Sequence, residues 1–214
     1  MVGIQMDLTL NVQEEVRCRK RFIPVIKKVK HKTHFTHEEL EALLIIFYKL
    51  TQNQAMDRIY FRKIMYDLLD FQNDVLIDRI FSAVDKNNKL NITMESWVLG
   101  MSIFLRGTLE EKIKFCFTVY DRMGDGYIKK THIFQALRHS EDEEADEDIK
   151  ELIEILMQKM DQDDDEKISL EDYRTAVLRN PLYLEFLGRC LPYRAAVYAF
   201  LTTFTPNVST MHFN

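Results

Sequence analysis

Apolar side chains recur every three or four residues in four separate stretches of the chain. This spacing puts them along one face of an α-helix, which turns once every 3.6 residues, and leaves polar side chains on the opposite face. Each stretch therefore predicts an amphipathic helix that packs its apolar face into a core. The apolar positions of the four stretches are, in turn, Leu40, Leu43, Leu44 and Phe47; Leu76, Ile80, Phe81 and Val84; Ile113, Phe117, Val119 and Tyr120; Leu152, Ile155, Leu156 and Met160.

Each predicted helix leads into a 12-residue segment, and these segments repeat along the chain. They begin at residues 49, 85, 121 and 161, so successive starts lie 36, 36 and 40 residues apart. Every segment has an apolar residue at its eighth position, and another apolar or aromatic residue follows its last position. The eighth positions are Met56, Ile92, Ile128 and Ile168, and the following residues are Phe61, Trp97, Ile133 and Tyr173. This repetition predicts four copies of one helix–loop–helix unit.

The chemistry of the last segment identifies the unit. Residues 161–172 read D-Q-D-D-D-E-K-I-S-L-E-D, with carboxylates at the first, third, fifth and twelfth positions. This is the spacing of an EF-hand calcium loop, in which alternate side chains of a tight loop converge on one hard cation. Paired EF-hand loops meet through a short two-stranded contact at the eighth position. We therefore expect an all-α fold with four EF-hand units in two paired lobes.

The same spacing predicts how the chain is divided. Gly107 and Thr108 form a break between the second and third units, because Thr108 can cap a helix whose first turn carries Glu110 and Glu111. The expected parts are a basic amino-terminal arm, 1–35; a first lobe, 36–106, with loops 49–60 and 85–96; a second lobe, 107–188, with loops 121–132 and 161–172; and a carboxy-terminal tail, 189–214.

The first two loops have lost the oxygen ligands that calcium requires. Loop 49–60 has Lys49 and Tyr60 at its ends, and Asp57 is its one carboxylate at a ligand position. Loop 85–96 has a cation, Lys89, at the fifth position and the short Ser96 at the twelfth. A divalent ion needs six to eight oxygen ligands and is repelled by a lysine within ligand distance. We predict that neither loop binds metal.

The third loop keeps only part of a site. Asp121 and Asp125 remain, but Met123 occupies the third position and His132 the twelfth. A glutamate at the twelfth position normally supplies two oxygens and one negative charge, so its loss is costly. Asp121 and Asp125 therefore predict a residual site that does not hold calcium.

The fourth loop is the remaining candidate for a metal site. Its predicted ligands are the side chains of Asp161, Asp163, Asp165 and Asp172 and the backbone carbonyl of Lys167. Glu166 stands where glycine is expected, which costs on the order of 1 kcal/mol in a left-handed conformation. Asp172 is one methylene shorter than glutamate, which favours Mg²⁺ or weakly bound Ca²⁺. The alternative is a loop held by helix pairing, with its carboxylates in water and no ion.

Charge and composition narrow the class of protein. The net charge of −5 does not suggest a nucleic-acid partner. Eight basic and no acidic residues lie between positions 17 and 32, so this arm is either solvated or in contact with an acidic microtubule surface or an anionic membrane. Positions 141–148 hold seven carboxylates, which we interpret as a solvated linker rather than as a second metal site. Three distant cysteines indicate a reducing, intracellular compartment, and no stretch is long and apolar enough to span a membrane.

Two apolar segments follow the fourth unit. We expect residues 181–191 to pack within the second lobe, with partner binding as the alternative. We expect residues 195–204 to need cover from that lobe itself or from a partner. The sequence has no nucleophile elbow, phosphate-binding glycine loop or zinc-spaced Cys/His cluster, so we predict that the protein is not an enzyme.

Residues 97–120, W-V-L-G-M-S-I-F-L-R-G-T-L-E-E-K-I-K-F-C-F-T-V-Y, resemble two EF-hand families: the calaxins of ciliary axonemes and the neuronal calcium sensors. The acidic linker and helix at 143–161 and the segment Y-L-E-F-L-G-R-C-L-P at 183–192 are similar to calaxin. The resemblance covers residues 36–192. It implies a scaffold in the outer dynein arm docking complex of a ciliary or flagellar axoneme, with docking-complex coiled-coil proteins, dynein or tubulin as partners.

The sequence departs from the calaxin pattern at the ligands of the second and third loops, where it has Lys89, Leu90, Ser96, Met123 and His132. We therefore expect an adaptor that supports ciliary motility with a lost or weak calcium response. The alternative is a regulator of the neuronal calcium sensor type that acts on a channel or enzyme. Gly3 follows Val2, so the myristoylation pattern is absent.

Overall fold

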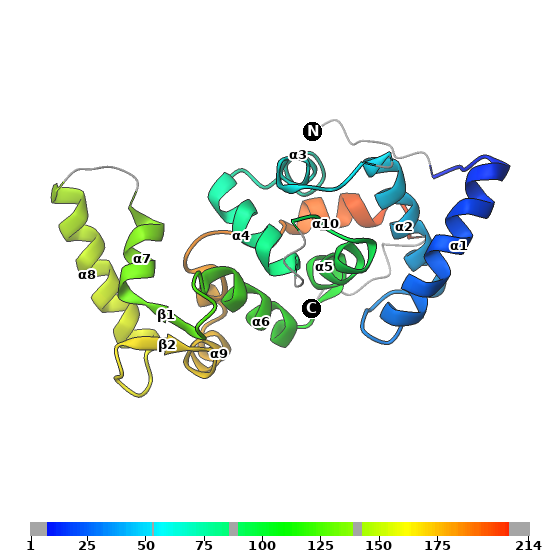
Figure 1. The fold of residues 1–214 in the computed structure, drawn as a ribbon. Helices are drawn as coiled ribbons and strands as arrows, with labels where there is room; N and C mark the ends of the chain where they lie inside the picture. The colour runs from blue at the N-terminus through cyan, green and yellow to red at the C-terminus, as the bar shows by residue number, and fades with distance from the viewer. Residues whose placement is uncertain (1–7, 53, 86–89, 139–142, 206–214) are drawn as a thin grey trace. The chain divides into compact units, whose positions relative to one another are not determined.

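The computed structural model describes residues 8–52, 54–85, 90–138 and 143–205 (Figure 1). These residues form α-helices, one short 3-10 helix and one two-stranded sheet, which confirms the predicted all-α EF-hand fold. They divide into two compact units. The first contains the described residues up to Thr108 and those from Pro192 onward, and the second runs from Leu109 to Leu191. The division predicted from the sequence stays a prediction.

The first unit holds two helix–loop–helix pairs. Helices α2 (His37–Thr51) and α3 (Arg58–Leu69) flank the first loop, and α4 (Asp74–Val84) and α5 (Met94–Arg106) flank the second. The side chains of Thr36, Asp57, Asn73 and Thr93 cap the four helices by accepting hydrogen bonds from backbone N–H groups of the first turn. The two loops meet at an antiparallel bridge between Met56 and Ile92, as their eighth positions predicted.

Helix α1 (Val12–Val29) comes from the segment expected as a basic arm. A capping box between Asn11 and Glu14 starts it, and its buried side chains are Cys18, Phe22, Ile26 and Val29. These side chains recur at helical spacing, and α1 packs against α2 and α5. The apolar face of the arm is therefore part of the core of the first unit, while its basic residues remain exposed.

Helix α10 (Arg194–Leu201) comes from the apolar tail and returns to the first unit, where it packs against α3 and α5 (Figure 1). Its buried side chains are Ala196, Val197, Phe200 and Leu201. The sequence predicted cover from the second lobe or from a partner, but α3 and α5 of the first unit cover this helix instead. The face of α3 and α5 that α10 occupies is therefore not open to a partner helix while α10 is in place.

The second unit repeats the arrangement. Helix α6 (Leu109–Tyr120), strand β1 (Tyr127–Lys129) and α7 (Lys130–Leu137) form the third EF-hand unit. Helix α8 (Glu143–Met160), strand β2 (Lys167–Ser169) and α9 (Leu170–Arg179) form the fourth. The strands pair antiparallel with Ile128 opposite Ile168, and both side chains are buried. The loop pairing predicted for this lobe is therefore confirmed.

The core of the second unit is aromatic. The ring centroid of Tyr173 lies 5.9 Å from that of Phe117 and 6.4 Å from that of Tyr120. The rings of Tyr120 and Phe186 meet edge to face, with their centroids 5.4 Å apart. The 3-10 helix η1 (Pro181–Glu185) packs against α6 and α9. The expected packing of residues 181–191 within this lobe is thus observed.

One predicted helix face is wrong in part. On α8 the stripe Leu152, Ile155, Leu156 and Met160 was expected to be buried, but Leu152 and Ile155 are 43% and 53% exposed. Met160 is buried as expected, but Ile153 and Met157 are buried in place of Leu152 and Ile155. The reason is that α8 packs mainly against α7 and α9, which contact a different face of the helix from the one its apolar spacing suggested.

Candidate metal site and partner surfaces

The fourth loop brings three carboxylates together. Oxygen atoms of Asp161, Asp163 and Asp165 all lie within 4.8 Å of one another. The loop is shaped by its own hydrogen bonds: Asp161 accepts from the backbone N–H of Glu166 at 2.9 Å, and Asp165 accepts from that of Lys167 at 3.0 Å. These are the first three predicted side-chain ligands, and a divalent cation is the chemical species that such a group favours.

The electrostatics of this cluster also favour a cation. Desolvation raises the pKa of Asp163, and the neighbouring carboxylates of Asp165, Asp172 and Asp161 raise it further. Desolvation is the larger cause, and repulsion between like charges adds to it; either a proton or a metal ion would relieve that repulsion. One internal cation already acts on the cluster, because the Lys167 ammonium lies 3.6 Å from an oxygen of Asp165.

Two features of the loop weaken the site. Glu166 has a φ of 65°, in the left-handed region that glycine adopts without strain. Asp172 is engaged in a capping box, in which it accepts from the backbone N–H of Ser169 at 2.9 Å and from its hydroxyl at 2.6 Å. Asp172 also accepts a long hydrogen bond of 3.4 Å from the backbone N–H of Gln162. Its predicted role as a ligand, and that of the Lys167 carbonyl, stay predictions.

The carboxylates of Asp121 and Asp125 in the third loop are bound by other groups of the same loop. Asp121 accepts hydrogen bonds of 2.8 Å from the backbone N–H groups of both Gly124 and Gly126. Asp125 pairs with the Lys129 ammonium at 2.5 Å, and this hydrogen bond lowers the pKa of Asp125. Met123, at the third ligand position, is 68% exposed and turned to solvent. The Lys129 ammonium thus neutralises the Asp125 carboxylate, as a bound cation would.

Protein groups also close the first two loops. In the first, the hydroxyl of Tyr60 donates to the backbone carbonyl of Leu50, so the twelfth residue reaches back to the second. In the second, buried Asp85 accepts a 2.9 Å hydrogen bond from the backbone N–H of Leu90, and Ser96 bonds to the helix-capping Thr93 at 3.1 Å. The predicted effect of Lys89 lies outside the described residues.

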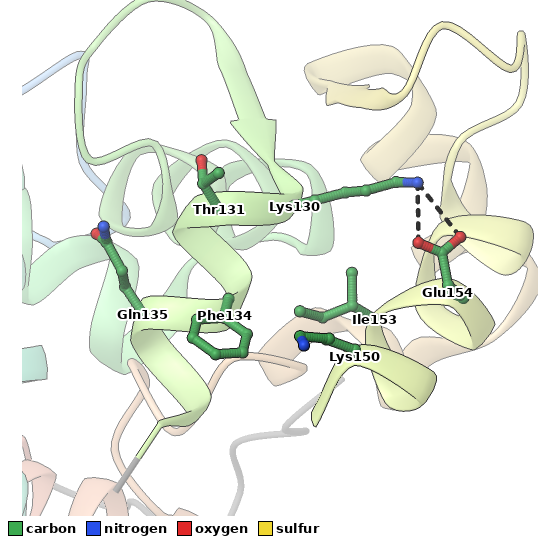
Figure 2. Close-up of a pocket in the computed structure, with 7 residues that line it drawn as sticks. All are labelled: Lys130, Thr131, Phe134, Gln135, Lys150, Ile153 and Glu154. Carbon is green, nitrogen blue, oxygen red and sulfur yellow. Dashed lines mark hydrogen bonds and ion pairs between the residues drawn. The ribbon is translucent and has the colours of Figure 1, made fainter. Parts of the chain in front are cut away.

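A cleft of about 310 Å³ lies between α7 and α8 in the second unit. Figure 2 shows the aromatic ring of Phe134 and the side chain of Ile153 forming its floor. Lys130 bridges one end with hydrogen bonds of 2.9 and 3.2 Å to the two carboxylate oxygens of Glu154. An apolar side chain from a partner helix would fit such a floor. Sequence reasoning missed this surface, because the short α7 shows no clear stripe.

The solvent face of α1 is strongly basic. Its exposed side chains include Arg17, Lys20, Arg21 and Lys27, for which no ion pair is observed among the described residues. Arg19 pairs with Glu15 on the same helix at 3.0 Å, but both side chains are more than half exposed. A helix that is anchored by its apolar face and basic on the opposite face is suited to an acidic partner surface.

None of the described helices combines the length and apolar character that a membrane crossing requires.

Comparison with known proteins finds similarity along most of the chain. The family model described as an EF-hand domain pair matches residues 110–178. Calaxin from Xenopus laevis is 38% identical over 202 residues, which cover 89% of this chain and 93% of that protein. Calaxin from Homo sapiens is 41% identical over 175 residues, covering 76% and 83%. A recoverin family protein from Dictyostelium discoideum is 26% identical over 184 residues, covering 73% and 82%.

Proposed function

Because the chain belongs to the calaxin family of EF-hand proteins, we propose that it acts as a non-enzymatic adaptor of the ciliary or flagellar axoneme, in the outer dynein arm docking complex. The observation that carries this proposal is the extent of the similarity, which spans both EF-hand lobes rather than one motif. The role follows from the family resemblance of residues 97–120, 143–161 and 183–192, and it would support ciliary motility.

The adaptor would respond weakly or not at all to calcium. Within the described residues, the fourth loop holds the one group of three carboxylates placed for a metal ion. In the first loop, Tyr60 stands at the twelfth ligand position, and its hydroxyl donates to a backbone carbonyl of the same loop. In the third loop, the Lys129 ammonium pairs with the carboxylate of Asp125, as a bound cation would. If the fourth loop binds Ca²⁺ or Mg²⁺, the ion would stabilise the loop and the β1–β2 pair, and partner binding would not require it.

The surfaces suited to partners are the α7–α8 cleft and the basic face of α1. The cleft, with Phe134 and Ile153 among its lining, suits an amphipathic helix such as a segment of a docking-complex coiled coil. The basic face suits an acidic surface such as that of tubulin. Dynein is the third partner that the resemblance implies. The proposed location is accordingly the cytoskeleton of a cilium or flagellum.

Localisation of a tagged full-length chain in ciliated cells tests the adaptor role. We expect the wild type and the variant Asp161→Asn/Asp163→Asn/Asp165→Asn to reach the axoneme equally, since docking would not depend on the metal site. The double variant Phe134→Asp/Ile153→Asp, which places charge on the floor of the cleft, should reduce axonemal retention. A wild-type chain that is diffuse in the cell body, outside the axoneme, would contradict the proposal.

A second candidate function is a calcium-responsive regulator of the neuronal calcium sensor type, acting on a channel or enzyme. The cluster of Asp161, Asp163 and Asp165 favours it, as does similarity to a recoverin family protein. Calorimetric titration with Ca²⁺ and Mg²⁺ separates the two. Sub-micromolar Ca²⁺ affinity accompanied by newly exposed apolar surface would support the regulator, and the absence of heat at millimolar Ca²⁺ would exclude it.

A further inference from the structure

Two thiols that are 74 positions apart in the sequence meet in the core of the second unit. Cys116 lies on α6, Cys190 lies in the non-helical segment after η1, and both are buried. Their sulfur atoms are 3.0 Å apart, about 1 Å more than the ~2.05 Å of a disulfide bond. We propose that Cys116 and Cys190 are an oxidation site, at which a peroxide joins the two thiols in a disulfide within the second unit.

The reaction balances with hydrogen peroxide as the oxidant. The sulfur of one cysteine attacks a peroxide oxygen, the O–O bond breaks, and the departing hydroxide leaves as water with the thiol proton, which gives a sulfenic acid. The sulfur of the second cysteine then attacks the sulfenic sulfur, the S–O bond breaks, and the hydroxyl leaves as a second water with the second thiol proton. The two thiols lose two electrons, and the peroxide is reduced to two waters.

The surroundings assign the two cysteines different roles. Cys116 lies within α6, where burial raises its pKa and the neighbouring Cys190 and Glu185 raise it further. The segment that carries Cys190 is not helical and is held by the Glu185 carboxylate, which accepts from the backbone N–H groups of Cys190 at 2.9 Å and Leu191 at 2.8 Å. Opening this segment breaks fewer hydrogen bonds than unwinding α6. Cys190 therefore meets the peroxide first, and Cys116 resolves the sulfenic acid.

The disulfide would tie α6 to the segment through which the chain leaves the second unit. In the reduced protein that segment is attached to α6 by the Tyr120 hydroxyl, which donates to the carbonyl of Gly188 at 2.7 Å. A covalent link beside this hydrogen bond would restrict movement of α6 against η1, and closing so long a stretch of chain stabilises the folded state. In the reducing compartment that the cysteine count predicts, the thiol form is the resting state, and the link is a response to oxidant.

The test uses the full-length chain, reduced, freed of reductant and incubated with hydrogen peroxide. The product is denatured in the presence of N-ethylmaleimide, which alkylates free thiols. It is then digested, and its peptides are mapped by mass spectrometry. We expect a linked pair of peptides carrying Cys116 and Cys190, alkylated Cys18, and a yield that does not change when the protein is diluted. Dithiothreitol should restore three alkylated cysteines. The oxidised chain should also unfold at a higher temperature than the reduced one.

Cys18 provides the matched control, because it is also buried but lies on α1 in the first unit. Cys18→Ser should keep the cross-link, whereas Cys116→Ser and Cys190→Ser should each lose it. The deciding measurement is on the wild type and so does not depend on whether the variants fold. Alkylation of both Cys116 and Cys190 after peroxide treatment, or separate oxygen adducts on each, would overturn the proposal.

Discussion

The Glu39 carboxylate forms a buried ion pair with the Arg106 guanidinium, which joins the first turn of α2 to the last turn of α5. The two contacts are 2.9 Å, from Nη1 to Oε2, and 2.5 Å, from Nη2 to Oε1, and the side chains are 7% and 18% exposed. The same carboxylate accepts hydrogen bonds of 2.9 Å from the backbone N–H of Thr36 and the hydroxyl of Thr205. One side chain thereby links α2, α5 and the segment that follows α10.

Removing the cation from this pair should destabilise the first unit strongly. Arg106→Met leaves the Glu39 carboxylate buried without its counter-ion, and we expect a loss of about 3–5 kcal/mol in the free energy of unfolding, measured with urea. The matched control is Arg174→Met, which breaks the same kind of pair with Glu110 where both side chains are more than a third exposed. Equal losses for the two variants would contradict the role assigned to burial.

The same carboxylate predicts a loss of stability in acid. Desolvation pushes the pKa of Glu39 upward, but the hydrogen bonds from Arg106, Thr36 and Thr205 outweigh it and leave the pKa below the ordinary 4.5. Since the folded state holds the proton less tightly than the unfolded state, this contribution is present above about pH 4.5 and is lost as the pH falls through the folded pKa. Urea midpoints from pH 6 to pH 3 should show this decline, and Glu39→Gln should have a shallower one.

Relieving the backbone strain at Glu166 should stabilise the fourth loop. Glu166→Gly supplies the residue that adopts a φ of 65° freely, so we expect a gain of about 1 kcal/mol in unfolding free energy. Glu166→Ala is the control, because it removes the same carboxylate but retains a β-carbon. A gain of equal size in the alanine variant would assign the effect to charge rather than to backbone conformation.

Lengthening the twelfth residue of the fourth loop should improve calcium binding. Asp172→Glu adds the methylene that bidentate coordination requires, so calorimetry should show Ca²⁺ bound about tenfold more tightly or better, with a smaller change for Mg²⁺. Asp125→Asn in the third loop should leave the titration unchanged, because Asp125 is already paired with Lys129. An unchanged Ca²⁺ isotherm for Asp172→Glu would mean that the fourth loop is not a metal site.

The packing of α10 should contribute measurably to the first unit. Leu201 is fully buried at the end of α10, so Leu201→Ala should cost about 2–5 kcal/mol in unfolding free energy. Leu182→Ala makes the same chemical change at a side chain that is 85% exposed, and it should have little effect. Similar urea midpoints for Leu201→Ala and the wild type would show that α10 is not docked in solution.

Much of the candidate site could be predicted from the chain alone. The 12-residue spacing placed Asp161, Asp163 and Asp165 in one loop, and the structure brings their oxygens together because the loop is local and tight. Asp172 shows the limit of this reasoning. It stands at the twelfth position, where the spacing predicts a ligand, but its carboxylate accepts hydrogen bonds from Ser169, and the spacing does not account for such competing bonds.

Local periodicity and residue type are enough to predict the EF-hand repeat, the pairing of Met56 with Ile92 and of Ile128 with Ile168, and the loss of metal ligands. By contrast, the folded chain alone reveals that α1 and α10 complete the first unit and that Cys116 lies beside Cys190. These contacts join residues far apart in the chain. The stability of these contacts comes from the surface that two distant segments bury against each other, and the pattern of one short segment does not indicate which distant segment it will pack against.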